Sequence, residues 1–93
     1  ANFKDAFLIK SQFENAFLIN TNFKNAFLME ANLTGSYLMG ADFENASLYK
    51  ADLRGAKGLT LEQLTKAKTL YLAKFDDEIL DQIKTNLPEL VGA

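Results

Sequence analysis

Few side chains in this sequence could perform acid–base or nucleophilic chemistry. The 93 residues contain no His and no Cys, which removes the commonest general base, the thiol nucleophile and the usual zinc ligands. The remaining candidates are carboxylates, such as Asp42, Glu44 and Asp52. A catalytic carboxylate pair needs a cleft and shifted pKa values. We therefore expect these groups to be solvated surface, and we expect no enzyme activity, no metal and no cofactor.

Composition and short motifs add little to this chemistry. The sequence has 10 basic and 12 acidic residues, a balance that gives no reason to expect nucleic-acid binding. No apolar run is long enough to span a membrane, and no basic segment followed by an apolar run opens the chain. We therefore expect a cytoplasmic location. The glycosylation-like triplets at Asn32 and Asn45 are by-products of the repeat described next.

The elements that position these groups are set by a repeat of five residues. Leu or Phe occupies eleven consecutive positions at this spacing, from Phe3 to Leu53. A small residue lies two before each, and Gly, Asn or Asp lies two after eight of the eleven. On a helix these residues would scatter, because five residues advance the side chain about 140° beyond a full turn. Short extended segments joined by corners, where Gly or Asn tolerates a positive φ, instead predict a β-solenoid.

A second period of ten residues predicts how many sides each coil has. The residue before each Leu or Phe alternates between polar and aromatic, as in Asn2, Phe7, Gln12 and Phe17. A three-sided coil would place Phe7 over Asn22, whereas a four-sided coil places it over Phe27. Because like side chains favour neighbouring positions in a ladder, four sides of five residues fit the sequence.

The repeat resembles that of the pentapeptide-repeat proteins, whose consensus is a small residue, Asn or Asp, then Leu or Phe and two variable residues. The units ANFKD, TNFKN, ANLTG, ADFEN and ADLRG match it, whereas AFLIK, AFLIN, AFLME and SYLMG carry an aromatic residue in place of Asn or Asp. The resemblance covers residues 1–57 and implies an all-β solenoid, a right-handed quadrilateral β-helix. Its length would be about 2.75 coils, rising about 13 Å at the usual strand spacing.

The region 58–93 reads as a helical cap of the same domain. Thr60 to Gln63 form a capping box, which predicts a short helix from Leu61. Asp76 is the expected N-cap of a second helix, which Pro88 should end. The segment GLTLEQL resembles the terminal lid of bacterial, notably cyanobacterial, members of the family.

Outward aromatic and aliphatic side chains form the candidate interface. They fall on two opposite sides of the expected coil, and contiguous exposed apolar surface usually marks a contact site. Stiffening of the coil by the same ladders is the competing interpretation. The candidates are Phe7, Ile9, Phe17, Ile19, Phe27, Met29, Tyr37, Met39 and Tyr49.

Three function classes follow, of which a non-catalytic structural or protein-interaction module fits best. The alternative is a DNA mimic that inhibits or protects DNA gyrase, as some members of the resembled family do. Duplex DNA of 13 Å would show about eight negative charges, but residues 1–57 hold six acidic and six basic side chains. An enzyme ranks last. We expect an unidentified protein partner and no direct nucleic-acid contact; a homodimer through the uncapped N-terminal coil or the apolar faces is a further hypothesis.

Overall fold

The backbone turns a corner at every fifth residue. The computed structural model describes residues 1–92, and in it φ is positive at residue 5 and at each fifth residue up to Gly55. Eight of these eleven corners hold Gly, Asn or Asp, as the sequence predicted. Lys10, Glu30 and Lys50 fill the other three, with φ of 61°, 61° and 58°. The corner is therefore imposed by the repeat as a whole and not by the residue at the corner alone.

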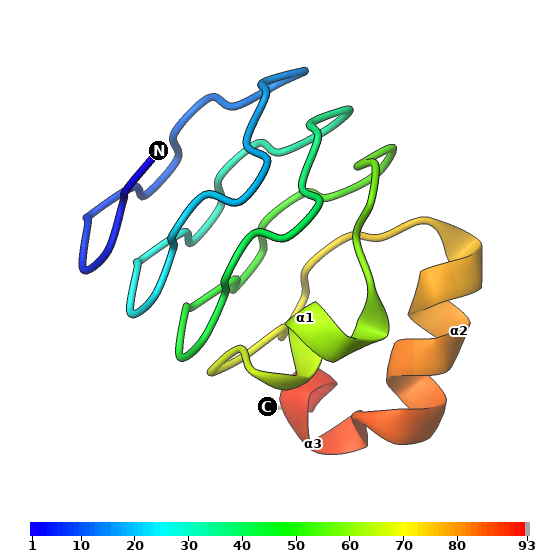
Figure 1. Cartoon of the computed structure of the whole chain (residues 1–93). Helices are drawn as coiled ribbons and strands as arrows, with labels where there is room; N and C mark the ends of the chain where they lie inside the picture. The colour runs from blue at the N-terminus through cyan, green and yellow to red at the C-terminus, as the bar shows by residue number, and fades with distance from the viewer. Residues whose placement is uncertain (93) are drawn as a thin grey trace.

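Successive coils pair at a spacing of twenty residues. Parallel bridges join Asn2 to Asn22 and continue in the same register up to Tyr37, which pairs with Lys57. The predicted placement of Phe7 beside Phe27 is confirmed by one of these bridges. Each side of a coil contributes a single bridged residue because the extended segment between two corners is only about three residues long. Figure 1 shows the resulting stack of coils, a β-solenoid with the N-terminus at one end.

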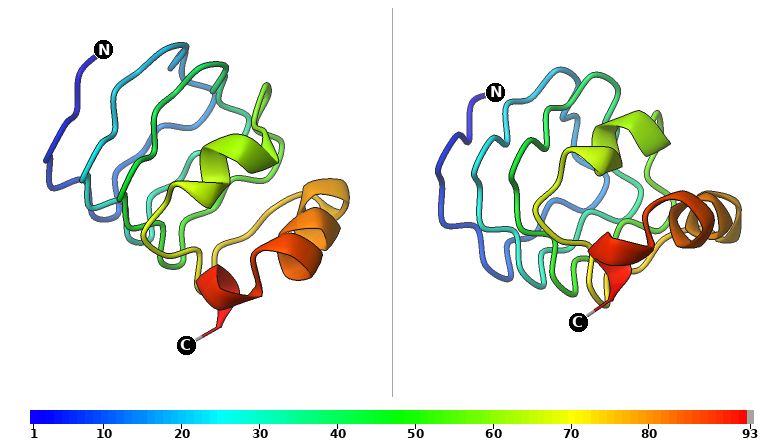
Figure 2. Two further views of the ribbon diagram at one scale, coloured as in Figure 1. Left: turned by 60° about the horizontal axis from the view of Figure 1, so that its bottom comes forward. Right: turned by 90° about the horizontal axis from the view of Figure 1, so that it is seen from below.

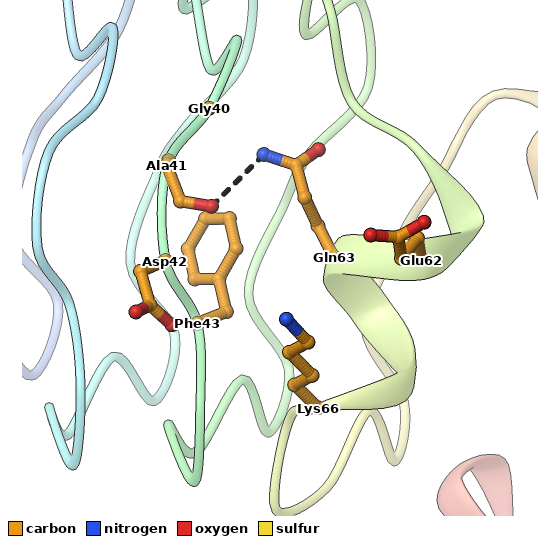
Figure 3. Close-up of a pocket in the computed structure, with 7 residues that line it drawn as sticks. All are labelled: Gly40, Ala41, Asp42, Phe43, Glu62, Gln63 and Lys66. Carbon is orange, nitrogen blue, oxygen red and sulfur yellow. Dashed lines mark hydrogen bonds between the residues drawn. The ribbon is translucent and has the colours of Figure 1, made fainter.

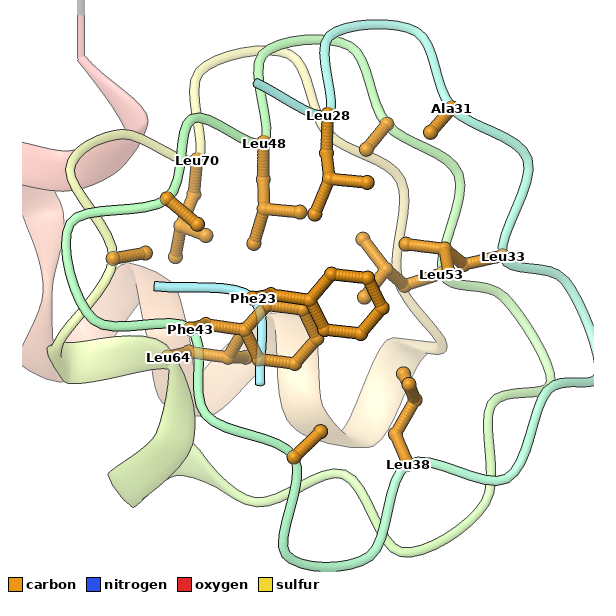
Figure 4. Packing of buried hydrophobic residues seen from close by; sticks show 14 of the residues in the cluster. Phe23, Leu28, Ala31, Leu33, Leu38, Phe43, Leu48, Leu53, Leu64 and Leu70 are labelled. Carbon is orange, nitrogen blue, oxygen red and sulfur yellow. The ribbon is translucent and has the colours of Figure 1, made fainter. Parts of the chain in front are cut away.

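The interior is a column of the repeated Leu and Phe side chains. Phe23 and Phe43 are fully buried, with ring centroids 5.3 Å apart and rings inclined by only 2°. Phe3 stacks on Phe23 with centroids 5.6 Å apart, so the three rings form one column. Leucines of the other sides point toward these rings (Figure 4).

Small residues near the backbone close the spaces between the large ones. Ser36 is buried and its hydroxyl donates to the Leu33 carbonyl oxygen over 2.7 Å, the kind of backbone partner that a buried hydroxyl needs. Thr21 is also buried, whereas Ser11, in the first coil, is only partly so. Across residues 1–92, every fully buried side-chain nitrogen or oxygen has a hydrogen-bond partner.

Three helices follow the regular repeat and lie together at the C-terminal end of the coil (Figures 1 and 2). They are α1 (Leu61–Thr65), α2 (Asp77–Asn86) and α3 (Pro88–Val91). The capping box that begins α1 is present as predicted, with Thr60 and Gln63 exchanging hydrogen bonds. Pro88 opens α3, at a first-turn position where its missing N–H does no harm.

The solenoid pairing continues between α1 and α2, a feature that the sequence did not predict. Thr69 pairs with Ser47 and Lys74 pairs with Asp52, each 22 residues apart instead of twenty. Leu70 is buried above Leu48 in the core column (Figure 4). The segment between α1 and α2 therefore adds two bridged sides to the solenoid, displaced by the two extra residues that α1 inserts.

The side chain of Asp76 does not cap α2, which corrects the expected role of this residue. Asp76 occupies the N-cap position, but its carboxylate makes no hydrogen bond to the first turn of the helix. Both carboxylate oxygens instead accept from the backbone N–H of Gly55, at 3.0 and 3.1 Å. Asp76 thereby satisfies a donor at the last corner of the repeat.

Candidate interaction surface

One side of the solenoid carries an outward ladder that we call the Phe7 face: Phe7, Ile9, Phe27, Met29, Tyr49 and Tyr71. The rings of Phe7 and Phe27 are nearly parallel, at 7°, with centroids 5.0 Å apart. Phe7 is 79% exposed and Ile9 is 50% exposed, whereas Phe27 and Met29 are half-buried. The first two coils therefore each add a wholly apolar row to this outer surface, whereas the later rows place Ser47 and Thr69 beside Tyr49 and Tyr71.

The opposite side carries a shorter ladder that we call the Phe17 face: Phe17, Ile19, Tyr37 and Met39. Phe17 and Tyr37 stack with centroids 4.9 Å apart, and Phe17 is 79% exposed. The ladder ends at Lys57, whose ammonium group lies 4.7 Å from the centroid of the Tyr37 ring. A cation over an aromatic face is a favourable contact, and it closes the apolar surface at the C-terminal end.

The stacking limits what these aromatic side chains can recognise. Within a ladder the rings lie on one another, so the faces that meet are not available to a nucleobase or a sugar ring. Phe7 and Phe17 each begin a stack and are 79% exposed, so one ring face of each remains open, together with the outer flank of each stack and the aliphatic side chain two residues on. The surface that remains is largely apolar.

Tyr71 belongs to the Phe7 face, and Leu72 follows it at the next corner. The sequence analysis predicted neither residue as part of the interface. Tyr71 stacks on Tyr49 with centroids 5.9 Å apart, and Leu72 is 51% exposed. The two-residue displacement introduced by α1 hides them from a period of twenty. The signal that could have found them is the local similarity of Leu70-Tyr71-Leu72 to Leu48-Tyr49-Lys50.

The other two sides are polar, and their side chains are occupied by local hydrogen bonds. Asn22 accepts from the backbone N–H of Lys24 at 2.9 Å, and Asp42 accepts likewise from Glu44. Lys24 also lies 3.6 Å from the Asp42 carboxylate of the next coil. On this side the first two coils carry Lys4 and Lys24 and the third carries Asp42 and Glu44, so acidic and basic side chains are equal in number.

Asp52 belongs to an ion pair with Arg54 whose environment is structural. Hydrogen bonds from the Arg54 guanidinium, at 2.9 and 2.6 Å, hold the pKa of Asp52 below its ordinary value. A carboxylate stabilised in its charged form is a poor general acid. Asp42 and Glu44 lie on the outer surface of the opposite polar side, and no cluster of three candidate metal ligands occurs in residues 1–92.

The sequence comparison is decisive for the family. The profile of pentapeptide repeats matches residues 1–35 and 28–57, with eight copies of the repeat. The chain belongs to the pentapeptide-repeat family. No curated protein gives a significant match over this sequence.

Solved structures similar to this pentapeptide-repeat protein include two of trypsin-treated QnrB1, a plasmid-mediated fluoroquinolone resistance protein. Both are 22% identical to the chain and cover 94% of it, with TM-scores of 0.48 and 0.46. The chain spans 44% and 43% of the length of these two proteins, so it corresponds to less than half of either.

The pentapeptide-repeat chain has a shallow depression of about 250 Å³ where α1 meets the coil. Figure 3 shows Gln63 reaching from α1 toward Ala41, with Lys66 and Glu62 at the rim. The Gln63 amide is already bonded to backbone carbonyl oxygens of the coil. This depression is therefore a structural junction. Within the part of the chain that the structure describes, no helix is long and apolar enough to cross a bilayer.

Proposed function

We propose that this pentapeptide-repeat protein is a non-catalytic protein-interaction module that contacts its partner through the Phe7 face and the Phe17 face. The observation that carries the proposal is the outward pair Phe7 and Phe17, each 79% exposed on opposite sides of a rigid coil. Each begins an apolar ladder on its own side, and such exposed apolar patches usually mark a contact site. Their stacks are fixed by backbone pairing, so little conformational entropy is lost when a partner binds.

The contrast between the sides of the coil supports the same assignment. On polar sides the residue before the core position is Asn or Asp in every unit except that of Gln12, and the Asn or Asp side chain accepts a backbone hydrogen bond, as Asn2 does from Lys4 at 3.0 Å. Phe7, Phe17 and Phe27 replace that residue and forgo the bond. Solenoid folding alone does not require an aromatic residue there, because the polar sides fold without one.

We also assign the finer architecture on physical grounds. The coil is a right-handed quadrilateral β-helix of about 2.75 regular coils, formed by residues 1–57, and residues 58–93 act as its helical cap. Three contacts support the cap: Gln63 donates to Ala41, Asp76 accepts from Gly55, and the Leu90 carbonyl accepts from Leu70. Each satisfies a backbone group that another coil would otherwise have bonded.

The test is protein capture from a lysate of the source organism with a variant carrying Phe7→Asn, Phe17→Asn and Phe27→Asn. Asn is the residue that polar sides use at this position, so the variant should fold and gain local hydrogen bonds. The matched control carries Lys4→Asn, Glu14→Asn and Glu44→Asn on the polar sides. We expect the control to capture the partner and the Phe variant to lose it.

Equal capture by the two variants would contradict the proposed function. Circular dichroism and thermal unfolding verify that both variants are folded before capture is compared. Sedimentation of the wild-type protein and of the Phe variant shows in parallel whether the partner is a second copy. A mass that halves in the Phe variant identifies the apolar faces as a homodimer interface, which is the same module with itself as partner.

A further inference from the structure

One corner of the solenoid differs from the others in the residues that adopt positive φ. It is formed by Lys10, Glu30, Lys50 and Leu72, which we call the charged corner. Among residues 1–92, these four are the positive-φ residues that are not Gly, Asn or Asp. They stack in register, because the N–H groups of Lys10, Glu30 and Lys50 donate to the carbonyls of Met29, Tyr49 and Tyr71, the residues that precede the next corner.

The left-handed conformation is unfavourable for Lys, Glu and Leu because their β-carbon approaches the following carbonyl oxygen. Asn and Gly avoid much of this penalty and occur at the other corners. Strain confined to one part of a structure is a reason to look for function there. Leu72 is the sharpest case, since it combines φ of 61° with 51% exposure of a large apolar side chain.

The surface around the charged corner is hollowed and carries charged side chains. A depression of about 440 Å³ lies here, lined by Glu30, Ala31, Asn32, Lys50, Asp52, Leu72 and Lys74. In the described chain, no ion pair within 4.0 Å joins Lys10, Glu30 and Lys50 to one another. The corner also borders the Phe7 face, with the Lys50 ammonium group 5.4 Å from the Tyr49 ring centroid. Charged groups and apolar surface are thus presented side by side.

We propose that the charged corner recognises an α-helix of a protein partner that carries acidic, basic, acidic and apolar side chains in succession along one face. The order complements Lys10, Glu30, Lys50 and Leu72. Three coil steps span about 14 Å. Helix positions i, i+4, i+7 and i+11 span about 16 Å, whereas alternate residues of a strand span about 20 Å. Long Lys and Glu side chains can accommodate the small difference in length between the corner and a helix. They cannot accommodate the larger difference between the corner and a strand.

This inference rests on the proposed interaction module and names the chemistry of its partner. The probe is a synthetic Ala-rich helix of about 20 residues with Glu, Lys, Glu and Leu at i, i+4, i+7 and i+11. A second helix, which serves as the comparison, has Lys, Glu, Lys and Leu at the same positions. We expect the wild-type chain to bind the first helix about tenfold more tightly than the second at low salt, with the preference reduced by added salt.

Two variants make the test specific. The charge-swapped variant carries Lys10→Glu, Glu30→Lys and Lys50→Glu, and it should reverse the preference between the two helices. The neutral variant carries Lys10→Asn, Glu30→Asn and Lys50→Asn. It should lose the preference while its thermal midpoint rises, because Asn tolerates this φ better.

An unchanged preference in the charge-swapped variant would overturn the inference. A lower thermal midpoint in the neutral variant would also overturn it, because the three charges would then serve the stability of the coil. Neither result touches the Phe→Asn capture experiment, which leaves the corner intact. Loss of partner capture there together with failure of the charge swap would retain the module and reject only this partner chemistry.

Discussion

The side-chain amide nitrogen of Gln63 donates to the carbonyl oxygen of Ala41 over 3.0 Å. The same nitrogen donates to the Leu38 carbonyl over 2.8 Å, while the amide oxygen accepts from the backbone N–H of Thr60. One coil earlier, the equivalent carbonyl of Thr21 accepts from the backbone N–H of Asp42. Gln63 thus takes the place of a backbone donor at the point where the chain leaves the solenoid to form α1 (Figure 3).

Replacement of Gln63 should therefore destabilise the end of the solenoid. Gln63→Ala removes a donor shared by two carbonyls and half of the capping box, and we expect a loss of about 1–3 kcal/mol in the free energy of unfolding. Gln63→Glu should cost more at neutral pH, because a carboxylate would face the carbonyl oxygens of Leu38 and Ala41. Urea unfolding of both variants measures this order.

Gln82→Ala on the exposed surface of α2 is the control. Its side chain is exposed, so its loss should leave stability within about 0.5 kcal/mol of the wild type. Equal stability of Gln63→Ala and Gln82→Ala would show that solvent replaces the Gln63 donor at no cost.

A second prediction concerns Gly35 and Gly55, which lie on the same corner ladder with φ of 67° and 74°. A β-carbon on Gly35 would collide with the amide oxygen of Asn15, whereas one on Gly55 would meet the backbone nitrogen and α-carbon of Gly35 at ordinary contact distances of 3.5 and 3.7 Å. Gly55→Ala should therefore cost about 1 kcal/mol for the backbone conformation alone. Gly35→Ala should cost about 2 kcal/mol, because the Asn15 side chain must also move.

Asn15→Gly supplies the internal control for this comparison. In the double variant with Gly35→Ala the collision is absent, and thermal or urea unfolding should show the extra cost of Gly35→Ala removed. If the two costs simply add in the double variant, crowding by Asn15 is not the reason that Gly35 is needed.

The corners, the core and the cap differ in how far the sequence could predict them. Spacing and residue type predicted the corners and the pairing of Phe7 with Phe27, because both follow from a repeat with one interior. They could not predict that Asp76 accepts from Gly55, a contact that depends on how α2 packs. The two-residue displacement at α1 likewise hid Tyr71, since a period gives no information about an insertion that bulges outward.

A third prediction follows from the lowered pKa of Asp52, caused first by its hydrogen bond from Arg54. A carboxyl group whose pKa is lower in the folded state stabilises the fold above its unfolded pKa of about 3.9 and loses that contribution as pH falls through the folded value. The wild-type protein should therefore lose stability relative to Asp52→Asn between neutral pH and pH 3. The effect should be small because the pair is near the surface.

Urea unfolding of the wild type and of Asp52→Asn across this pH range measures the difference. Asn keeps an oxygen that can accept from the backbone N–H of Arg54, as Asp52 does at 3.2 Å. The comparison therefore isolates the charge. Parallel stability curves for the two proteins from pH 7 to pH 3 would mean that the ion pair contributes nothing to folding.

The last prediction is that the chain does not act on DNA gyrase by imitating duplex DNA. A mimic of about 13 Å would present about eight negative charges, whereas residues 1–57 carry six acidic and six basic side chains. Lys24 lies 3.6 Å from Asp42, so opposite charges also meet on the surface itself. A supercoiling assay with the wild-type chain should show neither inhibition nor protection.

A variant with added negative charge tests the reason for this expectation. It carries Lys4→Glu, Lys10→Glu and Lys57→Glu, which give the coil nine acidic and three basic side chains. Inhibition gained by that variant alone would identify charge as the missing requirement. Inhibition by the wild-type chain would instead require a mode of gyrase recognition that does not depend on net charge.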